Sequence, residues 1–258
     1  MSKYAPVASY QLLTNLARTG YAGDYHLLLA HEVVDCPSQW EFLFKGSGLI
    51  PKGATIIMDN GLIELGEPCD AVVMKDAVDI VNATHAVLPD ALEDGAETLK
   101  LSRKAMDEWL RMEVDAYYMG VVQGRSYWEI IWCAKNLWNL GATASLGIPR
   151  IWQSRFGTRK LLQFFTELLP GVHGNIHLLG MSADLKDDLT CAVLPGVMGI
   201  DSANPLVCGW NERHLDVENI QHMERGSYWR DCTFANETML TNLDYIHSWL
   251  TNGTSPAD

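Results

Sequence analysis

The chain has few basic residues for its size, and this shortage limits the partners it can have. Its 258 residues include 19 Lys and Arg but 32 Asp and Glu, which gives a formal net charge of −13. Non-specific binding of nucleic acid depends on positive potential, so this balance argues against it. A local basic patch on an acidic body is still compatible with the composition, and the positions of the few Lys and Arg therefore matter.

Long apolar runs and closely spaced cysteines are also missing. No apolar run reaches the ~18 residues of a membrane-spanning helix, and the first ten residues contain no long apolar segment of the kind found in secretion signals. We therefore expect a cytoplasmic protein with no membrane partner. The six cysteines are scattered without a Cys-x-x-Cys pair, so we expect reduced thiols and no structural zinc site.

The sequence also lacks glycine-rich phosphate-binding loops. It contains instead a series of short apolar runs at regular intervals. No loop of the dinucleotide or P-loop type follows any run, which argues against a Rossmann fold. Each run is continuous and ends at a polar residue or a glycine, which is typical of strands buried on both faces. The runs cover residues 26–30, 55–58, 85–88, 117–122, 143–146, 176–179 and 197–200.

Helical patterns lie between these runs, so the sequence predicts repeated βα units and a parallel sheet. The count of runs favours a (β/α)₈ barrel in a single domain, residues 1–258, over an open doubly wound sheet. We expect the eighth strand within residues 208–233. Residues 1–24 are interpreted as an N-terminal extension with a short helix at 10–18, and residues 251–258 as a frayed tail. The main helices are predicted at 96–112, 127–140, 159–168, 183–193 and 236–250.

Polar side chains stand where the predicted strands end, and in a barrel these ends meet on the face where catalysis occurs. Carboxylates from different strands in one pocket raise the pKa of at least one of them, so one can be an acid while its neighbour stays an anion. Two carboxylates that flank a glycosidic bond can also perform a displacement with retention. The side chains in question are Glu32, Asp59, Asn60, Asp90, Gln123 and Asp201.

Simpler structural interpretations exist for most of these residues. Asp59-Asn60-Gly61 has the composition of a turn, and so does Gln123-Gly124. Asp90 precedes a predicted helix and could simply lie near its N-terminus. Asp201 is the hardest to explain in this way, because an acid directly after four apolar residues has no local structural role. Asp90 beside Gln123 suits a base edge that is rich in N–H donors.

Two histidines and two tryptophans call for separate interpretations. His85 and His177 lie at the starts of predicted strands, so we expect them in the core or at the end of the barrel opposite the site. Trp152 and Trp210 lie in loops after strands and are candidates for stacking on a nucleic-acid base.

Basic residues gather in and after the loop that follows the run at 143–146, and a barrel would place this loop on the catalytic face. A solvated charged loop is the simpler interpretation, but beside a carboxylate pocket such a cluster suits contacts with phosphates. The candidates are Arg150, Arg155, Arg159 and Lys160, together with Arg125 and Arg213, which also follow strands.

Six motifs occur in an order that resembles the guanine transglycosylases, (β/α)₈ enzymes that exchange guanine for a 7-deazaguanine in nucleic acid. The resemblance covers about residues 55–210, and it rests on the order of the motifs more than on any one of them. The motifs are Asp-Asn-Gly (59–61), Leu-Pro-Asp (88–90), Gly-Val-Val-Gln-Gly (120–124), Ser-Leu-Gly-Ile-Pro (145–149), His-Leu-Leu-Gly-Met (177–181) and Gly-Ile-Asp-Ser-Ala (199–203).

The resemblance implies a role for each matching position. Asp201 would be the nucleophile that attacks C1′ of the target nucleoside, and Asp59 its acid/base partner. Asp90 and Gln123 would read the guanine edge, with Asn60 beside them. The remaining base contacts implied are the Gly147 backbone and the Leu179 side chain. No cofactor or metal is implied for the chemistry.

Departures from the family pattern indicate which nucleic acid is the substrate. The chain has Asp-Asn-Gly-Leu where many members have Asp-Ser-Gly-Gly, followed by Glu64, whose role is open. It lacks the Cys-x-Cys-x-x-Cys…His zinc subdomain of the tRNA enzymes, and it is too short for the RNA-binding domains of archaeal members. This profile is similar to the phage-type DNA-guanine transglycosylases, which insert 7-deazaguanines such as preQ0 into DNA in the host-cell cytoplasm.

Three alternatives stay open at this stage. The first is the same exchange on tRNA, and the second is a non-catalytic, transglycosylase-like partner subunit. The third is an unrelated barrel hydrolase that acts on nucleosides or sugars. A homodimer is compatible with the sequence, which does not decide the oligomeric state.

Overall fold

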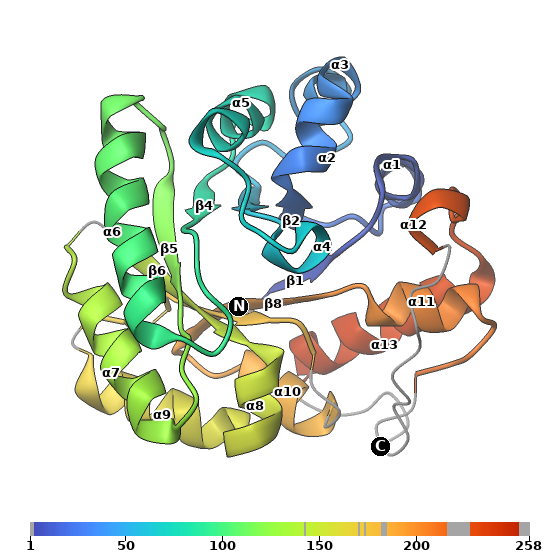
Figure 1. Ribbon diagram of the computed structural model, residues 1–258. Helices are drawn as coiled ribbons and strands as arrows, with labels where there is room; N and C mark the ends of the chain where they lie inside the picture. Colours follow the sequence, from blue (N-terminus) through green and yellow to red (C-terminus); the bar gives the residue numbers. More distant parts are fainter. Residues whose placement is uncertain are drawn as a thin grey trace.

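A computed structural model describes residues 3–141, 143–169, 171–172, 174–181, 185–215 and 228–252 of the chain. Its core is one parallel sheet of eight strands in the order β1-β8-β7-β6-β5-β4-β3-β2. Strand β1 also lies against β2, so the sheet is a nearly closed barrel, and helices surround it (Figure 1). The predicted (β/α)₈ barrel is therefore confirmed.

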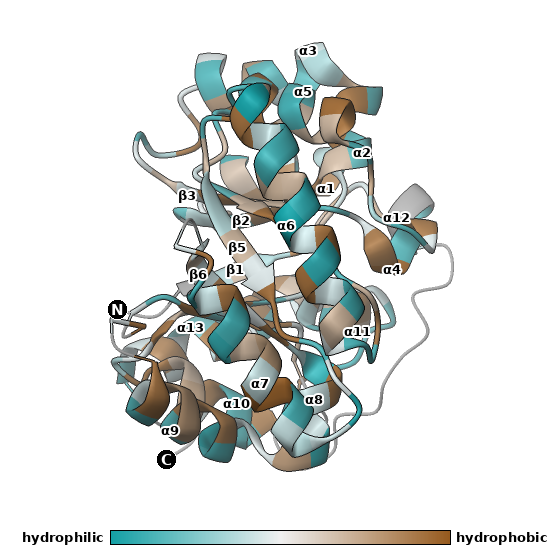
Figure 2. Cartoon of the chain, turned by 60° about the vertical axis from the view of Figure 1, so that its left-hand side comes forward, coloured by the Kyte–Doolittle hydropathy of each residue, from teal (hydrophilic) through white to brown (hydrophobic). Residues whose placement is uncertain are grey.

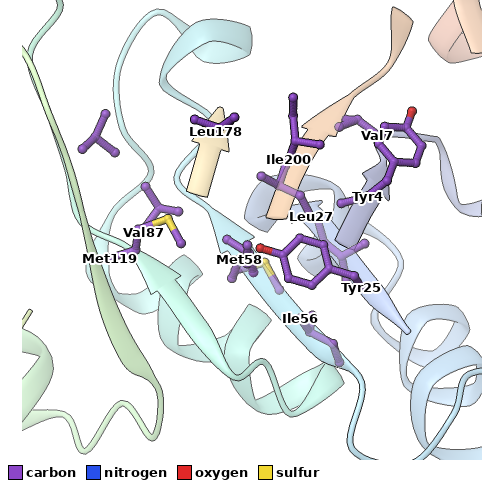
Figure 3. Close-up of a cluster of buried hydrophobic side chains, with 14 of the residues drawn as sticks. Tyr4, Val7, Tyr25, Leu27, Ile56, Met58, Val87, Met119, Leu178 and Ile200 are labelled. Atoms are coloured by element: carbon purple, nitrogen blue, oxygen red, sulfur yellow. The ribbon is translucent and has the colours of Figure 1, made fainter. Parts of the chain in front are cut away.

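Seven of the strands coincide with the seven apolar runs. Because helices cover the barrel outside and side chains fill it inside, both faces of these strands are buried, and the runs are continuous for that reason. The strands are β1 (Lys3–Pro6), β2 (Tyr25–Leu29), β3 (Thr55–Asp59), β4 (His85–Val87), β5 (Tyr117–Val121), β6 (Thr143–Pro149), β7 (Ile176–Leu179) and β8 (Val197–Ser202). Figure 3 shows side chains from different strands, among them Tyr25, Met58 and Ile200, gathered in one buried cluster.

Helices follow the strands and turn one apolar face toward the sheet. The longest of the helices beside the sheet, α6, buries Leu99, Met106 and Trp109, and Figure 2 shows hydrophilic and hydrophobic residues alternating along it. The helices are α1 (Tyr10–Arg18), α2 (Ala30–Asp35), α3 (Pro37–Glu41), the π-helical turn η1 (Phe42–Gly46), α4 (Leu62–Leu65), α5 (Ala71–Val81), α6 (Gly95–Arg111), α7 (Tyr127–Trp138), α8 (Arg150–Phe156), α9 (Thr158–Leu168), α10 (Leu185–Ala192), α11 (Asn204–Trp210), α12 (Tyr228–Asp231) and α13 (Glu237–Asn252).

The N-terminal segment corrects two predictions. Residues 3–6 form β1, which pairs with β8, and the predicted extension is therefore part of the barrel. This strand is the eighth, so its predicted position within 208–233 is wrong; residues 208–215 and 228–233 contain no strand, and residues 216–227 lie outside the described part. The pattern missed β1 because four residues that include a lysine and a proline make no apolar run. The short helix at 10–18 is confirmed.

The C-terminal end follows the prediction up to its last helix. Helix α13 reaches Asn252, so the first two residues of the predicted frayed tail are helical. The rest of that tail, residues 253–258, lies outside the described residues. In the part of the chain that the structure describes, no helix is long and apolar enough to cross a membrane.

The packing of α11 on α13 allows a direct test. A Cβ added to Gly209 would lie 2.6 Å from the backbone N and Cα of Met239, and backbone gives way less easily than a side chain. We expect Gly209→Ala to lower the free energy of unfolding by about 2 kcal/mol, as overpacking does. Urea unfolding measures this, with Gly196→Ala as control, because its Cβ would meet a single methyl of Thr166 at 3.0 Å. Equal stability of Gly209→Ala and wild type would contradict the packing described.

Candidate active site

The side chain of Asp201 is held from one side only. It lies at the C-terminal end of β8 and is 8% exposed. Its Oδ1 accepts a hydrogen bond from the backbone N–H of Gly180 at 3.1 Å and contacts Nε2 of His177 at 2.9 Å. Both contacts to the described residues thus use the same oxygen. Oδ2 is left to meet a ligand, which suits a carboxylate that acts as a nucleophile.

Asp59, at the end of β3, belongs to the same site. Its partial burial and the charge of Glu64 raise the pKa of Asp59 to about 7, while a hydrogen bond from the Gly61 backbone N–H opposes the rise. The charges of Asp90 and Asp201 raise it further. These electrostatic effects indicate that Asp59, Asp90 and Asp201 lie near one another. A carboxyl that titrates near neutral pH can both give and take a proton there.

The Asp59-Asn60-Gly61 segment is a turn as well as part of the site. Oδ1 of Asp59 accepts from the Gly61 N–H at 3.2 Å, and Oδ1 of Asn60 accepts from the Leu62 N–H at 2.9 Å. Gly61 has a φ of 70°, and a Cβ there would lie 2.8 Å from Nδ1 of His31. Glycine is therefore required on both conformational and steric grounds. The two interpretations of this segment are compatible.

Asp90 is the centre of a buried network with two amide side chains. Nε2 of Gln123 donates to Oδ2 of Asp90 at 2.7 Å, and Nδ2 of Asn60 donates to Oδ1 at 3.3 Å. Burial raises the pKa of Asp90 to about 6, and the two amide hydrogen bonds limit the rise. The carboxylate is thus an anion at pH 8 with lone pairs to spare. Asp94, not Asp90, caps the following helix α6, which removes the simpler interpretation of Asp90.

The side-chain oxygen of Gln123 is fixed by a residue of the loop after β4 and by a residue of helix α8. Its Oε1 accepts from the backbone N–H of Glu93 at 3.2 Å and from Nε1 of Trp152 at 3.3 Å. Trp152 is fully buried, so the prediction that it stacks on a base is wrong; its ring supports Gln123 instead. Trp210, at the end of α11, is 39% exposed, and its stacking role stays a prediction.

Gly147 and Leu179 lie against each other on the neighbouring strands β6 and β7. A Cβ added to Gly147 would stand 2.6 Å from Cδ1 of Leu179 and 3.5 Å from Sδ of Met119. The Gly147 carbonyl accepts from the Val122 N–H at 3.0 Å within the sheet. The absence of a side chain at Gly147 therefore lets the Leu179 side chain lie directly against the strand, and this leucine is only partly buried.

We expect Gly147→Ala to weaken binding of the ligand base more than it weakens the fold. The new methyl pushes the flexible end of Leu179 into the space beside the site, whereas no backbone atom opposes it. The apparent KM for the base should rise about tenfold, with a stability loss near 1 kcal/mol. Gly120→Ala, whose Cβ would meet Leu137 at 3.3 Å, is the control. An unchanged KM would show that this space is not used.

Two further acids line the rim near Asp59. Burial and the charge of Glu64 raise the pKa of Glu32, which follows β2, to about 7. Glu64, on α4, thus acts electrostatically on both Glu32 and Asp59. The sequence left the role of Glu64 open, and its charge acting on two neighbouring carboxyl groups is a role that the structure supports. It keeps two neighbouring carboxyl groups close to their protonated forms at neutral pH.

The predicted basic cluster divides into two parts. Arg150 begins α8, beside Gly180, whose N–H bonds Asp201. Arg155 forms an ion pair with Glu93 at 3.4 Å and lies over the Trp152 ring at 4.9 Å. These two arginines are therefore at the edge of the site.

The other basic candidates lie farther out. Lys160 covers the Tyr127 ring of α7 at 4.7 Å, and the charge of Arg159 acts on Cys191 of α10, so both belong to the helix layer. Arg125 and Arg213 are exposed in loops after β5 and α11. Phosphate contacts at all four stay predictions.

His177 belongs to the candidate site, and the sequence interpretation did not place it there. It was expected in the core or at the opposite end of the barrel; it is fully buried, but it contacts Asp201. Its place follows from the strand register, since Gly147 and His177 are paired across β6 and β7 and face the same side, and the sequence alone carries no such signal. Glu129 was missed as well: its carboxylate accepts from the backbone N–H of Gly95 and Arg125 at 3.1 and 2.8 Å, and so ties two site loops together.

The arrangement supports nucleophilic and acid/base chemistry by carboxylates. Among the described residues, no group of three or more His, Cys, Asp or Glu side chains is arranged to hold a metal ion. The site has one carboxylate with a free oxygen, one carboxyl that titrates near pH 7, and a third, amide-bound carboxylate that can accept N–H donors. No family model and no curated protein sequence matches the chain.

Proposed function

We propose that this chain exchanges guanine for a 7-deazaguanine such as preQ0 in DNA, through a covalent bond between Asp201 and the target sugar. The observation that supports this best is the difference between the two catalytic carboxyls. Asp201 has one oxygen held and one free, whereas Asp59 titrates at about pH 7 within reach of its charge. One group is thus suited to attack and the other to proton transfer.

In the first step, the target nucleoside leaves the base stack at a cost of a few kcal/mol and enters the mouth of the barrel. A lone pair of Asp201 Oδ2 forms a bond to C1′ while the C1′–N9 bond breaks. The electron pair leaves with guanine, and the protonated form of Asp59 gives its proton to the departing base. The product is a glycosyl ester of Asp201.

The second step reverses the first with a different base. Ionised Asp59 takes the N9 proton of the incoming 7-deazaguanine, and N9 attacks C1′ as the ester bond to Asp201 breaks. Two inversions give retention at C1′. Both protons pass through Asp59, so the cycle requires no redox or metal cofactor.

The Asp90 network is suited to choosing the base. A guanine edge presents adjacent N–H donors, and the Asp90 carboxylate can accept them in addition to its two amide partners. The amide of Gln123 has a second N–H for an acceptor on the base, because one N–H is committed to Asp90. Both guanine and 7-deazaguanines offer this edge, as an exchange reaction demands.

DNA is the substrate that we favour over tRNA. The tRNA members of the resembling family carry a zinc subdomain after the seventh strand, and the cysteine spacing of this chain does not provide one. The basic residues near the site are few, so phosphate contacts are local, centred on Arg150 and Arg155. The reaction would take place in the cytoplasm.

Label exchange tests the proposal directly. The protein is incubated with radiolabelled guanine and either DNA or tRNA, and in parallel with DNA and preQ0, followed by mass spectrometry of the nucleosides. We expect label and the preQ0 nucleoside in DNA. Label in tRNA alone would move the activity to tRNA, and release of free guanine without an acceptor would indicate a hydrolase. No exchange into either nucleic acid by folded protein would leave the non-catalytic partner subunit.

A further inference from the structure

We propose that Tyr25 and His177 form a relay that fixes which oxygen of Asp201 attacks the sugar, an inference that rests on the proposed function for its catalytic meaning. The relay runs from β2 through β7 to β8. The Tyr25 hydroxyl lies 2.7 Å from Nδ1 of His177, and Nε2 of His177 lies 2.9 Å from Oδ1 of Asp201. All three side chains are buried.

The relay sets the tautomer of His177. Burial raises the pKa of Tyr25 well above its usual value, and the charge of Asp201 adds to the rise, so the phenol keeps its proton. Nδ1 of His177 is the acceptor that the phenol reaches among the described residues. With Nδ1 accepting, the ring proton must sit on Nε2. His177 is therefore a donor to Asp201.

The consequence is an asymmetric nucleophile. Oδ1 of Asp201 receives two hydrogen bonds, from Nε2–H of His177 and from the Gly180 N–H at 3.1 Å. These donors lower the nucleophilicity of Oδ1 and fix the carboxylate plane, so Oδ2 is presented to C1′. The same donors stabilise the carboxylate when it leaves in the second step. His177 is thus a positioning residue, and Tyr25 acts through it.

The contact between Tyr25 and His177 crosses the interior of the barrel. Tyr25 is on β2 and His177 on β7, and β1 and β8 stand between them in the sheet. On β8, the residue in register with His177 is Gly199, which has no side chain to separate the two. The rings meet with their centroids 5.7 Å apart at 43°. A contact between strands this far apart in the sheet has no explanation in local chain geometry.

Two substitutions of His177 separate its donor role from its bulk. His177→Leu fills similar space without a donor, and we expect formation of the covalent enzyme–DNA adduct to slow about 100-fold. His177→Gln keeps an N–H near the Nε2 position and should stay within about tenfold of wild type. His26→Gln is the matched control, because His26, on β2, is also a fully buried histidine. Wild-type adduct formation by His177→Leu, or an equal loss in both His177 variants, would overturn the relay.

A spectroscopic measurement tests the relay without any activity. Nitrogen-15 NMR of the histidine rings should show His177 as the Nε2–H tautomer in wild type. In Tyr25→Phe, Nδ1 of His177 loses its donor, so we expect the nitrogen-15 shift of Nδ1 to move toward that of an unbonded ring nitrogen, together with adduct formation slowed about tenfold. An Nδ1–H tautomer in wild type, or no change in Tyr25→Phe, would refute the relay. If wild type makes no exchange while these NMR results hold, the proposed function fails and the relay stands.

Discussion

Asp201→Asn should abolish base exchange, and with it the covalent adduct between enzyme and nucleic acid. The neutral amide offers no anionic oxygen to C1′, so no glycosyl ester forms, and we expect a loss of at least ~10⁴-fold. The fold should persist, because the amide oxygen can still accept from the Gly180 N–H. Labelled-guanine exchange and a denaturing gel that resolves the adduct measure the two effects.

A carboxyl outside the site controls for the loss of one negative charge. Asp244, on α13, accepts a hydrogen bond from the Tyr21 hydroxyl at 3.0 Å, and Asp244→Asn should exchange guanine as wild type does. Exchange at the wild-type rate by Asp201→Asn would remove Asp201 from the mechanism. In that case a mechanism without a covalent intermediate, or another nucleophile, would have to be sought.

Asp59→Asn should slow exchange and stabilise the fold at the same time. The variant cannot transfer a proton to or from the base, so we expect a loss of about 10²- to 10⁴-fold. In the folded protein the pKa of Asp59 is raised from 3.8 to about 7. Ionising it therefore costs folding free energy, and the amide removes this cost, giving a gain of about 4 kcal/mol at pH 8, because each pKa unit corresponds to about 1.4 kcal/mol.

The sign of this effect gives a pH test. Below pH 3.8 the carboxyl is protonated in both folded and unfolded states, so it costs nothing there; the cost grows from pH 3.8 to about 7 and is constant above. The gain of Asp59→Asn should accordingly be full at pH 8 and small at pH 4. Urea unfolding at the two pH values measures it, with Asp76→Asn on the exposed side of α5 as control. A gain independent of pH would show that the titration of Asp59 is not its cause.

Much of the barrel and part of the site could be predicted, for a physical reason. A strand buried on both faces is an unbroken apolar run, and a polar residue that ends it stands out; Asp59 and Asp201 were found in this way. Asp90 and Gln123 follow the same logic, and the structure places them in one hydrogen-bonded network. These predictions needed only local sequence.

The residues that were missed depend on contacts between distant segments. His177 is one polar residue inside an apolar run, and its importance comes from Tyr25, 152 positions away. Trp152 was predicted in a loop after a strand, as a stacking residue, but it belongs to helix α8, and tertiary packing buries it against Gln123. Similarly, β1 is too short and polar for its pattern to be read; pairing with β8 makes it a strand. Register and packing, which a single sequence does not state, decided each case.

The pairing of β1 with β8 also determines when the strand edge beside Asp201 is complete. Ala5 is in register with Asp201, and the Tyr4 hydroxyl donates to the Ser202 carbonyl at 2.6 Å across 198 positions of sequence. Among the described strands, β1 has its hydrogen-bonded partner in β8, far away in sequence, and a contact of such long range forms slowly. The surroundings of Asp201 are therefore complete only when β1 has paired with β8. A chain that lacks β1 can contain most of the barrel and still leave this edge of β8 unpaired, so the edge that carries Asp201 is completed only in the closed barrel.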